Sequence, residues 1–444
     1  MSHQSAFLRI PGFAVLTAAI LLMNAGPVRP APSFSVNGPA SGEEPDLPYV
    51  PGEILVKFKP EVPDAYRAAT LVRHDSRAVD LIPALEVYRV EIPAGASVEE
   101  KVAAFAGDPG VLFAEPNYIG RATTTPNDTL FNYQYALANT GQSIGDVPGS
   151  PQGKIGADIK APQGWEGSRG DGSVMIAIID SGVELTHPDL AGKIAGPGRD
   201  FVNDDYDATD DLYHGTAVAG IAAADTDNAE GIAGVAWNAM ILPVKVLNDN
   251  GAGPVARVSE GIIWAAEQGA QVINISLGFN SASQTLLDAV KYAFNRGCVL
   301  VASAGNDSGP VKFPAAFAAY VLAVAATDYN DEVWERSNAG PEVDVAAPGV
   351  HILTTIPTWF FGLGPLPYRY MDGTSMAAPH VSGLAAILKS QKPWLSAAEI
   401  MEIIRLSADD VNSLTLPGID DSIGYGRINM EKALVPLKLE NNLP

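Results

Sequence analysis

The sequence predicts an α/β protein whose main domain is a parallel sheet with helices on both faces, preceded by a small α+β domain. Five apolar runs have the length of buried strands, at 174–179, 240–246, 271–276, 298–303 and 321–326. Helical patterns fall between and after them, at 214–224, 254–268, 283–296, 375–390 and 396–407. Strands that alternate with helices in this way are typical of a parallel sheet covered on both faces.

Composition excludes several classes of protein. The chain has 444 residues, of which 47% are hydrophobic, so it is long enough for more than one folding unit and is not a disordered composition. With 51 acidic and 28 basic residues, the net charge is −23, which argues against nucleic acid and anionic membranes as partners. Cys298 is the only cysteine, which excludes an intramolecular disulfide, and its place in an apolar run predicts a buried structural thiol.

The N-terminal residues have the pattern of a secretory signal peptide, which we assign to residues 1–30. Arg9 supplies the positive end, and an apolar run over 13–23 follows it. The run is short for a membrane-spanning helix, and the sequence has no later run of about 18 apolar residues. We therefore expect export to the outside of the cell without a stable membrane anchor. Residues 31–48, rich in Pro, Ser, Gly and acids, read as a linker.

Residues 49–119 predict a small domain of their own. Strand patterns lie at 53–59, 85–92 and 111–118, and helical patterns lie at 63–73 and after Ser97. Ser97 and Glu100 have the spacing of a capping box at the start of that second helix. The pattern fits a ferredoxin-like split βαβ arrangement.

Four short motifs carry the candidate chemistry. A small-residue turn presents Ser375 at the start of an apolar helix, where free N–H groups suit an oxyanion. Asp180 ends one buried strand, His214 begins a small-residue helix, and Asn306 follows another buried strand. Taken singly, each of these residues is as readily a helix cap or a turn residue. The order Asp, His, Ser is, however, one of the orders in which a serine-protease triad occurs.

With these motifs, from about Thr125 to about Val435, the chain resembles the subtilisin-like serine proteases (subtilases), and within them the thermitase branch. The resemblance implies a peptidase domain over 127–435, followed by a tail at 436–444. It implies that Ser375 is the nucleophile, His214 the general base and Asp180 the carboxylate that orients the imidazole. Asn306, together with the N–H of Ser375, would form the oxyanion hole.

The resemblance also implies how a polypeptide substrate binds. The substrate would add as a strand between two backbone segments of the enzyme, and small residues would wall the first specificity pocket. These small residues favour a tolerant apolar pocket and broad endopeptidase activity. The residues carried over are Gly251, Gly253, Ser276, Leu277 and Gly278 for the flanking segments, and Ser303, Ala304 and Gly305 for the pocket.

Structural Ca²⁺ is a further implication of the resemblance, at one or two sites. Oxygen ligands from scattered loops suit this ion. The first set is Asp128, Asp189 and Asn228 with the carbonyls near Thr226, Glu230 and Ile232. The second set lies in one acidic loop and comprises Asp200, Asn203, Asp205, Asp207 and Asp210. A solvated acidic loop without an ion is the alternative for the second set.

Residues 49–119 resemble the propeptide of the family, which inhibits the enzyme and assists its folding. We expect a zymogen that cuts itself within the polar segment 120–126, and a monomeric product. The chain departs from the family pattern at Ala217, where a second histidine is usual. It departs again in the long aromatic loop 357–371. We hypothesise that this loop touches substrate or propeptide, and a packed aromatic cluster is the alternative.

Two other functions compete with a protease. A serine esterase of the α/β-hydrolase type does not fit, because Gly-Thr-Ser-Met-Ala is not its Gly-x-Ser-x-Gly motif and the acid and histidine precede the serine. A catalytically inactive relative that binds peptides remains the alternative. The presence of all four candidate catalytic residues favours the active enzyme.

Overall fold

The computed structural model describes residues 49–119, 125–145, 150–360 and 366–434. The predicted signal peptide, the linker at 31–48, most of the segment 120–126 and the tail at 436–444 lie outside the described residues. In the part of the chain that is described, none of the helices is both long enough and apolar enough to cross a membrane.

The small N-terminal domain is a four-stranded antiparallel sheet with two helices, in the order β1 (Tyr49–Phe58), α1 (Asp64–Arg73), β2 (Arg77–Ile82), β3 (Val87–Glu91), α2 (Val98–Ala106) and β4 (Val111–Tyr118). The strand order β2-β3-β1-β4 confirms the split βαβ arrangement. Strand β2 was not predicted, because most of its side chains are exposed and its sequence does not alternate. Ser97 caps α2 by accepting the N–H of Glu100, as predicted.

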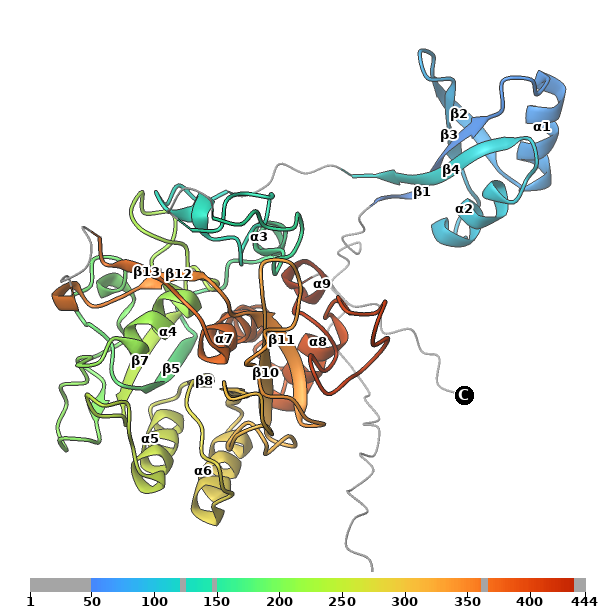
Figure 1. The fold of residues 1–444 in the computed structure, drawn as a ribbon. Coiled ribbons are helices and arrows are strands. Elements are labelled where there is room, and N and C mark those ends of the chain that lie inside the picture. The colour runs from blue at the N-terminus through green and yellow to red at the C-terminus, as the bar shows by residue number, and fades with distance from the viewer. Residues whose placement is uncertain (1–48, 120–124, 146–149, 361–365, 435–444) are drawn as a thin grey trace, which may run out of the picture. The chain divides into compact units, whose positions relative to one another are not determined.

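The main domain is built on a seven-stranded parallel sheet of order β11-β10-β9-β8-β5-β7-β6 (Figure 1). Its strands are β5 (Met175–Asp180), β6 (Arg199–Asp200), β7 (Met240–Lys245), β8 (Val272–Ile275), β9 (Val299–Ser303), β10 (Val321–Thr327) and β11 (Val343–Pro348). All five predicted strands are present. Strand β11 was not predicted, because Asp344 interrupts its apolar run. Asp344 Oδ1 accepts a bond from Arg405, and Oδ2 accepts the N–H of Ala323.

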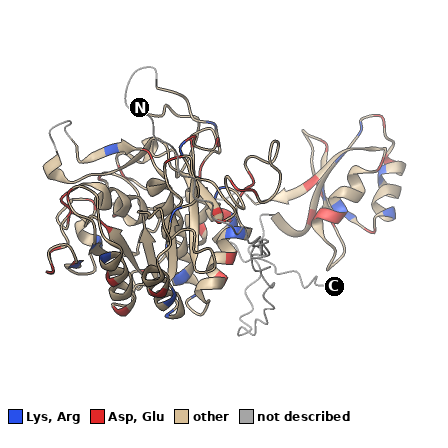
Figure 2. Ribbon diagram, turned by 60° about the horizontal axis from the view of Figure 1, so that its bottom comes forward, with Lys and Arg blue, Asp and Glu red and all other residues tan. Residues whose placement is uncertain are grey.

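Helices cover both faces of this sheet, which confirms the predicted layers. On one face lie α5 (Val255–Glu267) and α6 (Gln284–Asn295), against alternate residues of β5 such as Ala177 and Ile179. On the other face lie α4 (His214–Ala223), α7 (Thr374–Gln391) and α8 (Ala397–Leu406), against Ile176 and Ile178. Figure 2 shows charged residues mainly on helices and loops.

Shorter elements complete the domain. A hairpin of β12 (Ile352–Thr355) and β13 (Tyr368–Met371) leads directly into α7. The helices α3 (Ala161–Gly167) and α9 (Met430–Leu434) pack together, with Gly164 directly against Met430. Single 3₁₀ turns lie at η1 (Phe131–Tyr133), η2 (Ala191–Lys193) and η3 (Thr358–Phe360).

Candidate active site

The candidate catalytic and substrate-binding segments meet at one edge of the sheet. Asp180 ends β5, and the strands on either side of it are β7 and β8. The segment 251–253 follows β7, the segment 276–278 follows β8, and the segment 303–306 begins at the last residue of β9. Because the strands are parallel, all these segments emerge at the carboxyl edge, where ligands bind in open α/β sheets.

Asp180 and His214 form a bonded pair. The carboxylate of Asp180 is completely buried, and its two oxygens lie 2.8 and 3.0 Å from His214 Nδ1. The N–H of Ser181 donates to Asp180 Oδ1 at 2.7 Å and holds the carboxylate in place. Burial opposes the charged imidazole, but the charge and hydrogen bonds of Asp180 outweigh it and raise the pKa of His214. Because Nδ1 faces the carboxylate, it carries the proton of the neutral ring, and Nε2 can accept one.

Ser375 is the second residue of α7, and its backbone is held from outside the helix. Pro379, four residues later, has no N–H to donate to the Ser375 carbonyl. The hydroxyl of Ser276 donates to that carbonyl instead, at 3.0 Å. The hydroxyl of Ser375 in turn donates to the Ser276 carbonyl at 3.1 Å. A catalytic role for this hydroxyl would require it to turn from Ser276 to His214, and in enzymes without substrate such bonds often form only on binding.

A buried threonine orients the amide of Asn306. Asn306 Oδ1 accepts both the N–H of Thr374, at 2.9 Å, and its hydroxyl, at 2.7 Å. The same hydroxyl accepts the N–H of Gly305 at 3.1 Å. These bonds fix the orientation of the amide, so that Asn306 Nδ2, its donor group, lies beside the start of α7. The N–H of Ser375 belongs to the first helical turn and has no acceptor within the helix, so two donors are available for an oxyanion.

The predicted substrate-binding residues line the backbone around this edge. A Cβ at Gly253 would collide with the Val246 carbonyl, and one at Gly278 would lie 2.7 Å from Lys312 Cβ. Gly251 and Gly305 have φ values of 72° and 118°, a region that favours glycine. The remaining predicted residues, Ser276, Leu277, Ser303 and Ala304, lie at the ends of β8 and β9.

The first set of predicted calcium ligands comes together around Asp189. Asp189 is fully buried and accepts bonds from Asn228 Nδ2, at 3.0 Å, and from the N–H of Ile232, at 2.9 Å. The N–H of Asp227 donates to Asp128 Oδ2 at 2.8 Å, while Asp128 Oδ1 is buried without a partner. The hydroxyl of Thr226 instead donates to the Ala224 carbonyl, and the N–H of Glu230 donates to Asn228 Oδ1.

The environment of Asp189 and Asp128 fits a bound cation. Burial raises the pKa of Asp189 to about 7 and also raises that of Asp128. A Cβ at Gly231 would collide with both the Asp189 carboxylate and the Tyr368 hydroxyl, so only glycine leaves this space open. The described residues contain no group of three or more His, Cys, Asp and Glu side chains arranged for a metal. A site here would therefore depend on amide and carbonyl oxygens as well.

The second set of predicted ligands does not converge on one point. Asp200 accepts the N–H groups of Val202 and Asn203 and the side-chain amide of Asn203. Asp205 accepts the N–H of Asp207, and Asp207 bonds Thr209, which are local turns of the chain. Asp210 turns inward and is buried at only 2% exposure, whereas Asp205 and Asp207 are exposed.

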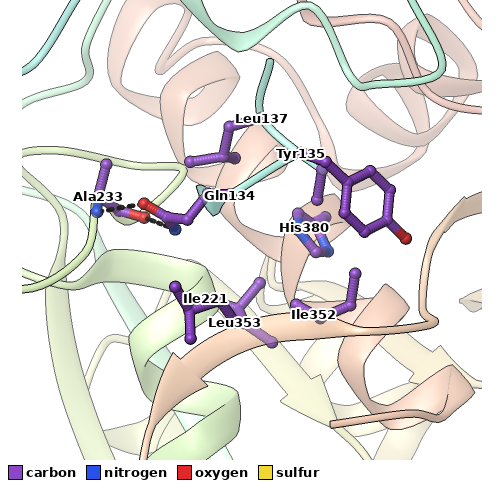
Figure 3. Close-up of a pocket in the computed structure, with 9 residues that line it drawn as sticks. Gln134, Tyr135, Leu137, Ile221, Ala233, Ile352, Leu353 and His380 are labelled. Atoms are coloured by element: carbon purple, nitrogen blue, oxygen red, sulfur yellow. Dashed lines mark hydrogen bonds between the residues drawn. The ribbon is translucent and has the colours of Figure 1, made fainter. Parts of the chain in front are cut away.

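A small cavity lies beside α7 (Figure 3). His380 of α7, Tyr135, Gln134, Leu137, Ile221, Ala233, Ile352 and Leu353 line it, with Ala136. Its volume of about 10 Å³ matches one water molecule. His380 Nδ1 lies 2.9 Å from the Met376 carbonyl, so Nδ1 carries the proton of a neutral ring. Burial lowers the pKa of His380 to about 4.

Acid should therefore destabilise the folded main domain through His380. Its folded pKa, about 4, lies below its ordinary value of 6.5, so the stabilisation is complete above pH 6.5 and is lost as the pH falls towards 4. This difference between the two pKa values corresponds to about 3 kcal/mol in the free energy of unfolding. We expect His380→Gln to lower the unfolding temperature at pH 8 and to reduce its fall between pH 8 and pH 4.5. His351→Gln, at a half-exposed histidine, serves as the control. An unchanged acid response in His380→Gln would contradict the prediction.

The aromatic residues of the predicted loop 357–371 divide into two groups. Tyr368 and Tyr370 lie on β13 and pack against the core. Phe360 lies 5.1 Å from Tyr213, the residue before His214, as measured between ring centroids, and Trp359 is 52% exposed. The described part of the loop is thus partly a packed cluster, while Trp359 stays available for contact. Phe361 lies outside the described residues.

Sequence reasoning did not identify Thr374, and it placed Ser276 beside the substrate without foreseeing the bond of its hydroxyl to the Ser375 carbonyl. Thr374 orients Asn306, and the hydroxyl of Ser276 replaces the bond that Pro379 cannot make. One signal was available: a proline four residues after Ser375 predicts a helix carbonyl without its usual donor. The role of Thr374 has no such signal, because its partner Asn306 is distant in the sequence.

Comparison with known proteins agrees with this geometry. Residues 171–426 match the Subtilase family, and residues 36–117 match the Fervidolysin N-terminal prodomain. A thermophilic serine proteinase of Bacillus sp. (strain AK1) is 41% identical over 87% of this chain and 88% of its own length. Thermitase of Thermoactinomyces vulgaris is 45% identical over 62% of this chain and 93% of its own length.

Two further relatives extend the comparison. A halolysin-like extracellular serine protease, Nep, of Natrialba magadii is 36% identical over 73% of this chain and 55% of its own length. The crystal structure of fervidolysin from Fervidobacterium pennivorans, described as a keratinolytic enzyme related to subtilisin, superposes with a TM-score of 0.58 and 29% identity. That match covers 89% of this chain and 63% of the other.

Proposed function

Because the chain belongs to the subtilase family of serine endopeptidases and carries an N-terminal prodomain, we propose that Asp180, His214 and Ser375 are its catalytic triad. Asn306 is the side-chain donor of the oxyanion hole in this proposal. The observation that carries it is the pair of short contacts from His214 Nδ1 to the buried Asp180 carboxylate, at the sheet edge that also holds Ser276 and Asn306.

The proposed reaction proceeds through an acyl-enzyme. His214 Nε2 takes the proton of Ser375 Oγ as that oxygen attacks the peptide carbonyl carbon. Asn306 Nδ2 and the N–H of Ser375 donate to the oxyanion, and Asp180 stabilises the charged imidazole. His214 then gives the proton to the leaving amine. A water molecule, activated by the same histidine, hydrolyses the ester and restores Ser375.

A serine-directed fluorophosphonate tests this proposal against the alternative of an inactive peptide-binding relative. The active enzyme should become labelled once per molecule, at Ser375, and should lose peptide hydrolysis in proportion to labelling. Labelling without any peptide hydrolysis would favour a different hydrolase. The absence of both labelling and hydrolysis would favour the inactive peptide-binding protein.

The substrate in this proposal is an extended polypeptide that pairs with the segments 251–253 and 276–278. Small residues at 303–305 wall a pocket that admits many side chains. We further propose that the enzyme is secreted as a monomeric zymogen and that residues 49–119 inhibit it until cleavage within 120–126. The N-terminal apolar run and a relative named as extracellular support the secretion.

Calcium binding at the first site is also part of the proposal. Asp128, Asp189 and Asn228, with backbone carbonyls of the loop 226–232, would hold the ion. Ca²⁺ would supply the positive charge that these buried carboxylates need. The second set, at 200–210, is the weaker proposal, because its exposed acids already make local turns.

Removing calcium should therefore destabilise the main domain at alkaline pH. Burial raises the pKa of Asp189 from its ordinary 3.8 to about 7, so the folded domain loses stability as the pH rises through this range and the carboxylate becomes charged. A bound cation would offset this loss at pH 8. A cation at 100 times its Kd adds about 2.7 kcal/mol of stability. Thermal unfolding at pH 8 with calcium or chelator should show this gain in the wild type and little of it in Asp189→Asn. Asp288→Asn, exposed on α6, should keep the gain. An equal calcium response in Asp189→Asn would contradict this site.

A further inference from the structure

The buried carboxylate of Asp210 links the segments that carry Asp180 and His214. Asp210 Oδ1 accepts the hydroxyl proton of Ser181 at 2.8 Å. Ser181 Oγ in turn accepts the N–H of Gly215 at 2.9 Å. Ser181 follows Asp180 in the chain, and Gly215 follows His214. The bond from Gly215 to Ser181 therefore ties the segment of the proposed base to that of the proposed acid, and Asp210 holds the Ser181 hydroxyl that accepts it.

The same carboxylate holds the turn that enters α4. Asp210 Oδ1 also accepts the N–H groups of Leu212, at 2.9 Å, and Tyr213, at 3.0 Å. Asp210 Oδ2 accepts the N–H of Thr216 at 3.0 Å and its hydroxyl at 2.7 Å. Tyr213 has a φ of 119°, which is strained for a residue with a side chain and persists only when its surroundings hold it. The next residue is His214, so this turn fixes the position of the His214 backbone, from which the imidazole extends.

A buried lysine reinforces the link between these two segments. Lys245 is 1% exposed, and its Nζ donates to the carbonyls of Ser181 and Leu247, both at 2.8 Å. It also donates to Asp211 Oδ1 at 2.6 Å. Adjacent acids in the loop thus have different partners: Asp211 pairs with a cation, and Asp210 receives neutral donors.

We propose that Asp210 is a positioning residue that keeps the His214 imidazole aligned between Asp180 and Ser375. The inference rests on the proposed triad and goes beyond it, because Asp210 touches none of the reacting atoms. It also reassigns Asp210, which sequence analysis placed among the ligands of a second calcium site. Both of its oxygens face protein donors, five in all, and the side chain is buried. Displacement of an imidazole by about 1 Å is enough to lower turnover about 100-fold.

Steady-state kinetics of the mature enzyme on a peptide p-nitroanilide test the inference. We expect Asp210→Ala to lower kcat by about 10- to 100-fold with KM changed less than about twofold, because alignment and not substrate binding is lost. Asp210→Asn keeps an oxygen acceptor for Ser181 but turns an amide N–H₂ group towards the N–H of Thr216, so it should recover only part of the lost kcat. Asp204→Asn removes the same charge from an exposed position of the same loop and should match the wild type.

A double-mutant cycle separates alignment from general loss of stability. Ser181→Ala breaks the same link, so adding it to Asp210→Ala should cost less than about threefold more in kcat. Wild-type kcat in folded Asp210→Ala, or independent effects of the two changes, would overturn the inference. Loss of the calcium-dependent rise in unfolding temperature with unchanged kcat would overturn it in favour of a metal ligand. An inactive wild type that fluorophosphonate does not label would instead reject the proposed triad.

Discussion

Replacing Ser375 with alanine is expected to lower kcat by about 10⁶-fold, the size of the loss when the nucleophile of such a triad is removed. The variant should remain folded, because Ser375 Oγ makes a single bond, to the Ser276 carbonyl, whereas its own carbonyl keeps the bond from the Ser276 hydroxyl. Any rate that remains above that of the uncatalysed reaction in water would come from the oxyanion donors and from substrate binding.

Intact mass over time, with calcium present, gives the clearest measurement of this variant. Only the wild type should lose roughly its first hundred residues, the span of the proposed signal and propeptide. Ser281→Ala, an exposed serine, serves as the control and should process normally. Trimming of both Ser375→Ala and the wild type would show that other proteases do the cutting. An untrimmed wild type that hydrolyses no peptide would favour the peptide-binding protein.

Replacing Asp180 with asparagine is expected to lower kcat by about 10⁴-fold while the fold stays intact. Asparagine has nearly the same shape, and its oxygen can still accept the N–H of Ser181. Its amide nitrogen would then face His214 Nδ1 as a donor. The imidazole would have to shift its proton to Nε2, where the base is needed, so the neutral ring could no longer accept the proton of Ser375.

The pH dependence of kcat/KM identifies this mechanism. The loss of the Asp180 charge should also lower the pKa of His214, which that charge raises in the wild type. The acid limb of the profile should therefore move to lower pH. Asp288→Asn, with the same chemical change at an exposed site, should leave both rate and profile unaltered. Asp180→Asn with more than a tenth of wild-type kcat would contradict the assigned role.

Much of the fold could be predicted because the sheet is buried on both faces. Buried parallel strands require unbroken apolar runs, and all five predicted runs are strands of the central sheet. The thiol of Cys298 is buried in line with its predicted structural role, and burial raises its pKa to about 11. Elements outside this pattern, such as the exposed β2 and the four-residue strands β12 and β13, have no comparable signal.

The candidate site divides in a similar way between what could be predicted and what could not. Asp180, His214 and Ser375 could be proposed from the sequence because each ends a strand or lies at the start of a helix with a recognisable local pattern. Thr374 and Asp210 act through partners such as Asn306 and Ser181, which are far away in the sequence. Such pairs exist only after the chain has folded, so a single sequence does not reveal them.

The helix α7 also constrains when the chain can fold during synthesis. Residues 374–389 of this helix are all buried, and they pack against the face of the sheet that carries Ile176 and Ile178. A ribosome makes α7 after every strand of that sheet. Until it emerges, a large apolar surface has no cover, and contacts between such distant residues form slowly. The nascent main domain is therefore exposed to aggregation and to proteolysis until α7 has been made and has packed against the sheet.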